Sequence, residues 1–244
     1  MYSSIVGTGS YLPNKILTNK EMESIVDTTD EWIYERTGIR QRHIGNEQES
    51  TSYMGFKAAK DALNSANIKK DQIDLIIVAT TTPDKIFPST ACIIQNLLNI
   101  EAPAFDISAA CTGFIYALSI ADIYIKSGLY KNVLVIGSDK YSDIIDWKDR
   151  TTCVLFGDGA GAVILSKANQ PGILSTNIQA DGKYNDLLTV SNNYIEMKGN
   201  EVFKVAVKTL GNLVDETLKE NKMKKSDIDW LVPHQANLRI ISAT

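Results

Sequence analysis

The sequence is poor in cysteine and histidine and has no excess of positive charge. Its 244 residues include three cysteines, at positions 92, 111 and 153, and two histidines. Three widely spaced cysteines without a Cys-x-x-Cys pair argue against a disulfide framework or a cysteine metal site, and they favour a reducing cytoplasm. Lysine and arginine number 25 against 29 aspartates and glutamates, a net charge of −4. Because nucleic-acid and membrane-surface binding usually need a basic excess, we expect neither partner.

Long hydrophobic runs and cofactor motifs are also missing. No stretch approaches the roughly 18 apolar residues of a transmembrane helix, and residues 1–7 have no basic leader, so we expect no signal peptide. There is no Walker lysine motif and no pair of histidines or glutamates with metal spacing. Residues 157–161 read Gly-Asp-Gly-Ala-Gly, which departs from the G-x-G-x-x-G spacing of dinucleotide sites. We therefore expect no metal ion and no bound cofactor.

Short apolar runs alternate with amphipathic segments along the chain. The runs lie at residues 75–79, 104–107, 133–136 and 162–165, and each is typical of a strand buried on both faces. Thr18 with Glu21, and Thr28 with Glu31, have the spacing of a capping box at the start of a helix. Apolar residues at three- and four-residue steps over 203–218 predict another helix. This alternation predicts an α/β fold with a mostly parallel sheet.

A short internal repeat indicates a duplicated fold. Residues 68–75 (Ile-Lys-Lys-Asp-Gln-Ile-Asp-Leu) resemble residues 223–230 (Met-Lys-Lys-Ser-Asp-Ile-Asp-Trp) at an offset of 155. The same offset carries Cys111 to position 266, beyond this sequence. We interpret the chain as a first half at 1–158 and a partial second half at 159–244. Coincidence between two helix-turn-strand units remains the alternative.

Cys111 is the strongest candidate for a nucleophile. It follows the strand predicted at 104–107 through small residues and precedes an amphipathic segment that begins at Phe114. A thiol at a helix N-terminus is exposed to unpaired N–H groups and the helix dipole, which lower its pKa and favour the thiolate. The alternative is a buried structural cysteine. Cys92 and Cys153 lie in apolar contexts without a turn, so we expect both in the core.

Two other features could serve a site. His234 follows the apolar run 230–232, which we predict to be a strand, and sites in parallel sheets gather where strands end. A structural role is the alternative for a lone histidine. Trp32 with Arg36 and Arg150 offers flat faces that could hold an aromatic base between them. Core packing is the alternative for Trp32, and the sequence does not separate the two.

Seven ordered segments resemble the 3-oxoacyl-[acyl-carrier-protein] synthase III family of the thiolase-like superfamily. They lie at residues 7–13, 30–33, 36–40, 104–114, 156–162, 199–204 and 233–240. The resemblance implies a duplicated five-layered α-β-α-β-α fold, here with an incomplete second half, and a homodimer. It implies an enzyme that initiates type II fatty-acid synthesis. An acyl group passes from acyl-CoA, with acetyl-CoA the expected primer, to a cysteine and condenses with malonyl-acyl carrier protein, releasing CO₂ and coenzyme A.

The resemblance also implies roles for individual residues. By matching position, Cys111 is the acylated nucleophile and His234 belongs to the family's Cys-His-Asn triad. The residues matched to coenzyme A binding are Trp32, Arg36, Thr37, Arg150 and Asn237. Phe87 matches a residue that reaches the partner subunit's acyl pocket. Lys204 and Arg239 match the basic surface on which the acidic carrier protein docks.

One family motif is missing from the sequence. The triad asparagine of the family lies in an H-G-N-T-S motif downstream of the histidine, and these 244 residues contain no such motif. We therefore expect the chain to be truncated at its C-terminus. There are two alternatives: the chain as given is a non-catalytic fragment that binds coenzyme A or carrier protein, or it is a related condensing enzyme similar to hydroxymethylglutaryl-CoA synthase.

Overall fold

The computed structural model describes residues 1–244, which form two compact units. Unit 1 comprises Met1–Lys15, His43–Lys140 and Asp158–Ile178. Unit 2 comprises Ile16–Arg42, Tyr141–Gly157 and Gln179–Thr244. Each unit is assembled from segments far apart in the sequence, so neither follows the division expected at 158/159, which stays a prediction about the repeat.

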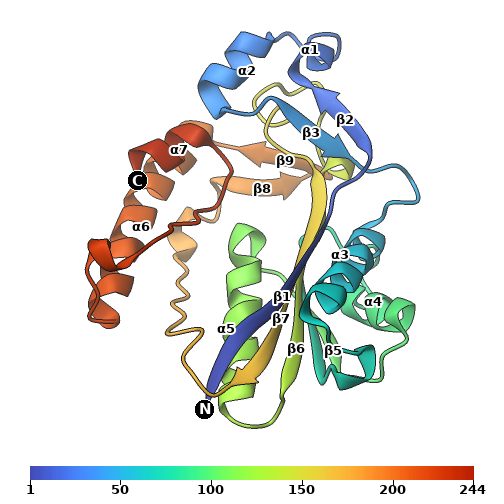
Figure 1. The fold of residues 1–244 in the computed structure, drawn as a ribbon. Coiled ribbons are helices and arrows are strands. Elements are labelled where there is room, and N and C mark those ends of the chain that lie inside the picture. Colours follow the sequence, from blue (N-terminus) through green and yellow to red (C-terminus); the bar gives the residue numbers. More distant parts are fainter. The chain divides into compact units, whose positions relative to one another are not determined.

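Unit 1 is built on a five-stranded sheet with the order β1-β7-β6-β4-β5 (Figure 1). The strands are β1 (Tyr2–Tyr11), β4 (Leu75–Ala79), β5 (Ala104–Ile107), β6 (Asn132–Lys140) and β7 (Asp158–Ala168). All four predicted strand segments are confirmed. The expectation of a mostly parallel sheet is confirmed for β1, β4, β5 and β6, which all run in one direction, whereas β7 runs antiparallel to both of its neighbours, β1 and β6.

Helices cover both faces of this sheet (Figure 1). They are α3 (Thr51–Ala66), α4 (Thr90–Leu98) and α5 (Gly113–Lys126). In β4, Ile76 and Val78 pack with α3 and α4 in one apolar cluster, whereas Leu75 and Ile77 pack with α5 in another. A strand that buries both faces has a continuous apolar sequence instead of an alternating one. This is why the run at 75–79 could be recognised.

Unit 2 contains the remaining α-helices and a short strand hairpin. Its helices are α1 (Asn19–Met22), α2 (Asp30–Thr37), α6 (Gly199–Glu220) and α7 (Leu238–Ala243). The strands β8 (Leu188–Ser191) and β9 (Tyr194–Met197) form an antiparallel hairpin, and β2 (Lys15–Thr18) pairs with β3 (Gln41–Ile44). Short 3₁₀ turns occur in unit 2 at Tyr141–Asp143, Gly182–Tyr184 and Lys225–Asp227, and in unit 1 at Lys70–Gln72 and Ala110–Thr112. The long amphipathic helix expected over 203–218 is confirmed as part of α6.

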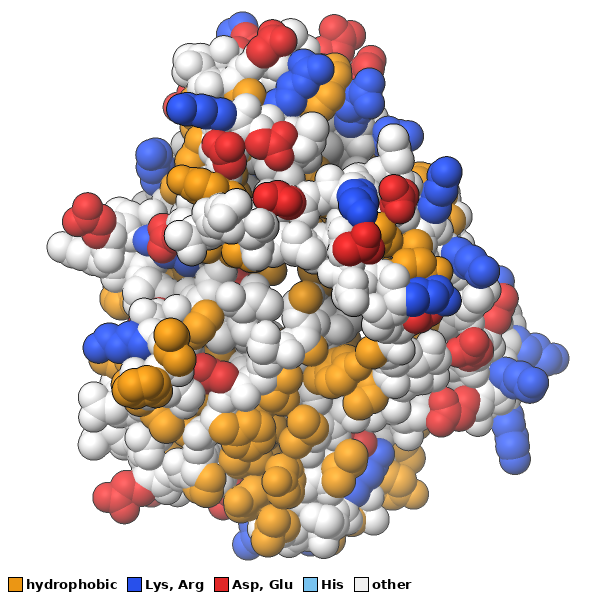
Figure 2. All heavy atoms as spheres, turned by 180° about the vertical axis from the view of Figure 1, so that it is seen from behind, with side chains coloured by type: hydrophobic (Ala, Val, Ile, Leu, Met, Phe, Trp, Pro, Cys, Tyr) orange, Lys and Arg blue, Asp and Glu red, His pale blue; other side chains and the backbone are white.

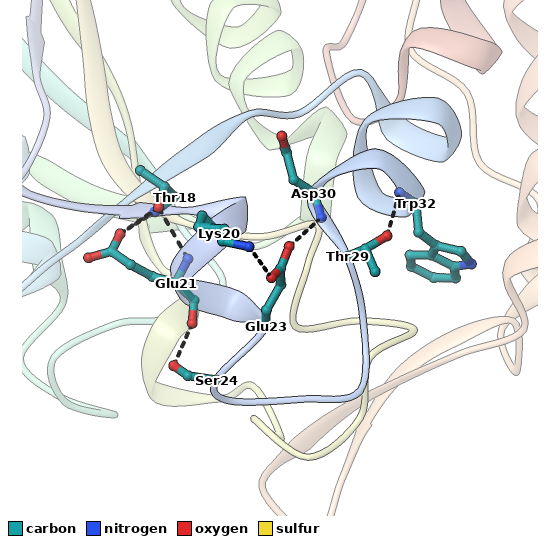
Figure 3. A network of polar contacts seen from close by, with 8 residues as sticks. All are labelled: Thr18, Lys20, Glu21, Glu23, Ser24, Thr29, Asp30 and Trp32. Carbon is teal, nitrogen blue, oxygen red and sulfur yellow. Dashed lines mark hydrogen bonds and ion pairs between the residues drawn. The ribbon is translucent and has the colours of Figure 1, made fainter.

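The first two helices of unit 2 begin at side-chain caps, as Figure 3 shows. Thr18 and Glu21 form the predicted capping box: the Thr18 hydroxyl accepts from the Glu21 backbone, and the Glu21 carboxylate accepts from the Thr18 backbone N–H at 2.8 Å. The cap predicted at Thr28 is wrong by one residue. Thr29 instead accepts from the backbone N–H of Trp32 at 3.1 Å and starts α2. Two adjacent threonines both fit the capping preference, so sequence alone favoured the wrong one.

The internal repeat has the same local structure in its two copies. In the first, the backbone N–H of Lys69 donates to the side chain of Gln72 at 2.9 Å. In the second, the backbone N–H of Lys224 donates to Asp227 at 2.8 Å, and each contact closes a 3₁₀ turn. The segments that come after the two turns differ. Residues 75–79 form β4, but Trp230–Val232 lie in none of the sheets, and Trp230 is 86% exposed. The predicted strand at 230–232 is therefore wrong, because a strand exists only when it is paired.

A buried polar cluster ties the start of β1 to α5. The Asp122 carboxylate accepts from the Ser3 hydroxyl at 2.5 Å and from the Lys126 ammonium at 2.7 Å, and both Ser3 and Asp122 are almost completely buried. We expect Asp122→Ala to lower the free energy of unfolding by about 3 kcal/mol, since Ser3 and Lys126 both lose their partner. Urea unfolding measures this. Lys20→Ala, which breaks an exposed ion pair with Glu23, should leave the free energy of unfolding almost unchanged, because solvent screens such pairs; an effect as large as that of Asp122→Ala would contradict the prediction.

Candidate active site

Cys111 lies where the sequence predicted, between the end of β5 and the start of α5. It occupies the 3₁₀ turn Ala110–Thr112, and α5 begins at Gly113. Ala110 adopts a left-handed backbone with φ of 45°, a conformation that costs energy for a residue with a side chain. The residue next to the cysteine is therefore held in a strained turn, and Cys111 itself is exposed.

The surroundings of Cys111 raise its pKa, contrary to the expected lowering. Desolvation has the largest effect and the negative charge of Asp139 adds to it, while a backbone hydrogen bond lowers the pKa by less. Both main causes penalise the thiolate. Cys111 therefore rests as the neutral thiol.

Asp139 is a site residue that the sequence analysis missed. It lies near the end of β6, and its carboxylate accepts from the backbone N–H of Thr81 at 2.8 Å and from the hydroxyls of Thr80 and Thr82 at 3.2 and 3.1 Å. Burial nevertheless raises the pKa of Asp139 above its ordinary value. A signal was present, since an aspartate two residues after Gly137 follows a fully buried strand segment, where sites of parallel sheets collect.

The role of Asp139 can be tested through the ionisation of Cys111. We expect Asp139→Asn to move the pH midpoint of Cys111 alkylation by iodoacetamide to lower pH, because the amide keeps an acceptor for the threonines but removes the negative charge. Mass spectrometry assigns the alkylated cysteine. The control is Asp71→Asn. Asp71 lies in the turn before β4, at the opposite end of the parallel strands from Asp139, so this change should leave the pH midpoint of Cys111 alkylation unchanged. An unchanged midpoint in Asp139→Asn would contradict the role of its charge.

The other two cysteines differ from each other. Cys153 is fully buried, as expected, and desolvation raises its pKa to about 11. The expectation of a core position is wrong for Cys92, which is exposed on α4 with its thiol 3.6 Å from the carbonyl of Ala104. The apolar neighbours of Cys92 misled the prediction, because on an amphipathic helix they alternate between a buried and an exposed face.

His234 lies in unit 2, four residues before α7. Desolvation lowers the pKa of its imidazole, so the ring is neutral at pH 7 and retains one N–H donor and one acceptor. Asn237, three residues on, caps α7 by accepting from the backbone N–H of Arg239 at 2.8 Å. This helix-capping contact was not foreseen for Asn237.

Trp32, Arg36 and Arg150 are brought together in unit 2. The guanidinium carbons of Arg36 and Arg150 lie 4.8 and 5.0 Å from the centre of the Trp32 ring, within the range of cation–π attraction. We call this group the Trp32 clamp. Trp32 is half-buried and both arginines are exposed, so the core-packing alternative does not describe it.

The Trp32 clamp is closed. A planar base stacked between Trp32 and Arg150 would need a separation of about 7 Å, twice a stacking distance, against the observed 5.0 Å. Arg150 is held by the carbonyl of Asp27 at 2.9 Å and by its carboxylate at 3.6 Å. Binding of a base therefore requires the Arg150 side chain to move. Thr37 is buried, and its hydroxyl donates to the carbonyl of Ile33 at 2.7 Å, within α2.

The remaining predicted residues lie on surfaces. Phe87 is 82% exposed, in the loop that precedes α4. Lys204 is exposed on α6, and the guanidinium of Arg239 lies 5.5 Å from the ring of the adjacent Phe203. Lys204 and Arg239 thus belong to one region of unit 2. Among the described side chains, no group of three or more histidines, cysteines, aspartates and glutamates is arranged to hold a metal ion. No helix is both long and apolar enough to cross a membrane.

Comparisons with known proteins agree on one family. The family model described as 3-oxoacyl-[acyl-carrier-protein (ACP)] synthase III matches residues 105–182, and the model of its C-terminal part matches residues 218–244. The whole chain is 57% identical to the beta-ketoacyl-[acyl-carrier-protein] synthase III of Salmonella arizonae and 54% identical to that of Thiobacillus denitrificans, covering 80% of each. The crystal structure of 3-oxoacyl-[acyl-carrier-protein] synthase III from Aquifex aeolicus superposes with a TM-score of 0.97 at 53% identity, over 99% of this chain and 79% of that one.

Proposed function

Because the chain belongs to the 3-oxoacyl-[acyl-carrier-protein] synthase III family and has its thiolase-like α/β fold, we propose that it catalyses the first condensation of type II fatty-acid synthesis. The substrates are acyl-CoA, with acetyl-CoA the proposed primer, and malonyl-acyl carrier protein. The observation that carries the proposal is the single thiol at the mouth of α5, Cys111, in a chain 54–57% identical to enzymes of that name. No metal or cofactor takes part.

The reaction proceeds in two stages on Cys111. In the first, the sulfur attacks the thioester carbonyl, the bond from that carbon to the sulfur of coenzyme A breaks, and the thiol proton leaves with coenzyme A. In the second, the malonyl group loses CO₂, and the electrons of the broken bond form the new carbon–carbon bond to the acyl carbon. Cys111 leaves as thiolate and regains a proton. Decarboxylation places negative charge on the malonyl thioester oxygen, and we assign the N–H of neutral His234 to stabilise it.

Intact-mass analysis after incubation with acetyl-CoA tests the proposal. We expect one acetyl group, which peptide mapping places on Cys111. Adding malonyl-acyl carrier protein should then remove it and yield 3-oxoacyl product, whereas acetoacetyl-CoA should not serve in its place. An acetyl group on Cys92 or Cys153, or none, would refute the assignment. Turnover with acetoacetyl-CoA alone would instead support an enzyme similar to hydroxymethylglutaryl-CoA synthase.

The Trp32 clamp is the proposed site for the adenine of coenzyme A, with Thr37 and Asn237 as further contacts. Stacking of a base on an aromatic side chain is worth about 1–3 kcal/mol. We expect Trp32→Ala to raise KM for acetyl-CoA about 10- to 100-fold and to leave KM for malonyl-acyl carrier protein unchanged. Acetyl-pantetheine, which has no adenine, is the matched substrate, and its KM should not change. A rise for both thioesters would contradict an adenine site.

Partners are assigned by charge and exposure. Lys204 and Arg239 provide exposed positive charge for the acidic carrier protein. For the homodimer, β5 is an edge strand of the sheet, and Ile86 and Phe87 are strongly exposed in the loop before α4, the helix that precedes β5. Figure 2 shows hydrophobic side chains gathered on the back of unit 1; an apolar surface of this kind is typical of an interface. We place Phe87 in the partner's acyl pocket and the enzyme in the cytoplasm.

A further inference from the structure

Asn19 and Arg42 form a buried polar hub in unit 2, the unit that also holds the Trp32 clamp. Their exposed fractions are 1% and 5%, and the Arg42 guanidinium donates to the Asn19 side-chain oxygen at 2.9 Å. No carboxylate accepts from Arg42, and burial lowers its pKa. Burying a cation without an acidic partner destabilises the folded state. The role of Arg42 therefore lies in the hydrogen bonds that it makes.

Asn19 fixes both ends of the helix that carries Trp32. Its side-chain amide donates to the Asp30 carboxylate at 2.8 Å, in the first turn of α2, and to the carbonyl of Ile39 at 2.7 Å, just after α2. The Asn19 backbone N–H also donates to the carbonyl of Arg40 at 3.0 Å. Both N–H groups of one amide thus hold α2 at its start and its exit.

Arg42 connects Asn19 to the segment that carries Arg150. Its Nη2 atom donates to the Asn19 oxygen and also to the carbonyl of Val154 at 3.0 Å, while Nη1 donates to the carbonyl of Leu17 at 3.2 Å. Val154 lies four residues after Arg150. One planar guanidinium therefore spans the two segments that supply the two sides of the clamp.

We propose that Asn19 and Arg42 are positioning residues that set the spacing between Trp32 and Arg150 and thereby the affinity for the adenine of coenzyme A. The proposal rests on the proposed function, because it takes the Trp32 clamp as the adenine site. Arg42 is buried and acts through its contacts with Asn19 and Val154. The fork geometry matters because Arg42 donates from two nitrogens held in one plane, whereas a lysine keeps the charge but donates from a single nitrogen.

Arg42→Lys tests the proposal through two thioesters. We expect KM for acetyl-CoA to rise about tenfold, the order of effect that a small displacement of binding groups produces, while kcat and the KM for acetyl-pantetheine stay unchanged. Gln41→Ala, at an exposed neighbour on β3, is the matched control and should behave as the parent enzyme. In a Trp32→Ala background, Arg42→Lys should have no further effect on KM for acetyl-CoA.

The outcomes separate the hub from the clamp itself. A rise in KM for both thioesters, or for neither, would overturn the positioning role of Arg42. If Trp32→Ala leaves KM for acetyl-CoA unchanged, the assignment of the adenine site is wrong, and the positioning role proposed for Asn19 and Arg42 is refuted with it. If Trp32→Ala raises KM and Arg42→Lys does not, only the hub is wrong. Asn19→Ser, which shortens the bridge without burying a new charge, should reproduce the Arg42→Lys pattern and provides a second, independent variant.

Discussion

Replacing Cys111 by alanine eliminates acetylation of the enzyme by acetyl-CoA and lowers condensation about 10³- to 10⁶-fold, the range found when a covalent nucleophile is removed. The reason is that Cys111 alone occupies the turn at the N-terminus of α5. Cys153 is fully buried and Cys92 lies on α4 with its thiol against the Ala104 carbonyl, so neither can replace it.

Intact mass and the rate of 3-oxoacyl product formation measure the effect of Cys111→Ala. Cys92→Ala is the matched control, since it removes an exposed thiol from the same unit and should retain full activity. A Cys111→Ala enzyme that still accepts one acetyl group would show that another nucleophile carries the first stage. Cys111→Ser keeps the approximate size of the side chain but replaces the thiol with a much weaker nucleophile. Loss of acetylation in this variant therefore reports the nucleophilicity of the sulfur and not the packing of the side chain.

The predicted elements that proved correct are those whose sequence signal is local. The run at 75–79 is apolar throughout because β4 buries both faces, and the Thr18–Glu21 box is made by two residues three apart. The antiparallel direction of β7 could not be predicted in this way. Direction depends on how the chain returns between β6 and β7 through residues 141–157, which lie in the other unit.

The electrostatics of the site were less predictable than its geometry. The sequence placed Cys111 at a helix mouth correctly, but the sign of its pKa shift depends on Asp139, which is 28 positions away and reaches the site only because β5, β4 and β6 are neighbours. The Trp32 clamp joins residues 118 positions apart, and the polar hub joins Arg42 to Val154. Such pairings follow from tertiary packing, and no spacing rule encodes them.

His234→Ala should separate the two stages of the reaction. We expect condensation to fall about 10²- to 10³-fold, the usual effect of removing one donor to a developing oxyanion, while acetylation of Cys111 still goes to completion. The lowered pKa of His234 keeps the imidazole neutral at pH 7. The neutral ring donates one N–H, so a different side chain with a neutral N–H donor at position 234 should partly replace it.

His234→Asn is therefore the decisive companion variant. Its amide N–H restores a donor but cannot titrate near neutral pH. We expect it to recover part of the condensation rate and to give a rate that stays constant over the pH range in which His234 gains a proton in the parent enzyme. His43→Gln, at the other histidine, should leave both stages intact. If His234→Ala prevents acetylation of Cys111 as well, the imidazole serves the first stage, and its assignment to the malonyl oxyanion is wrong.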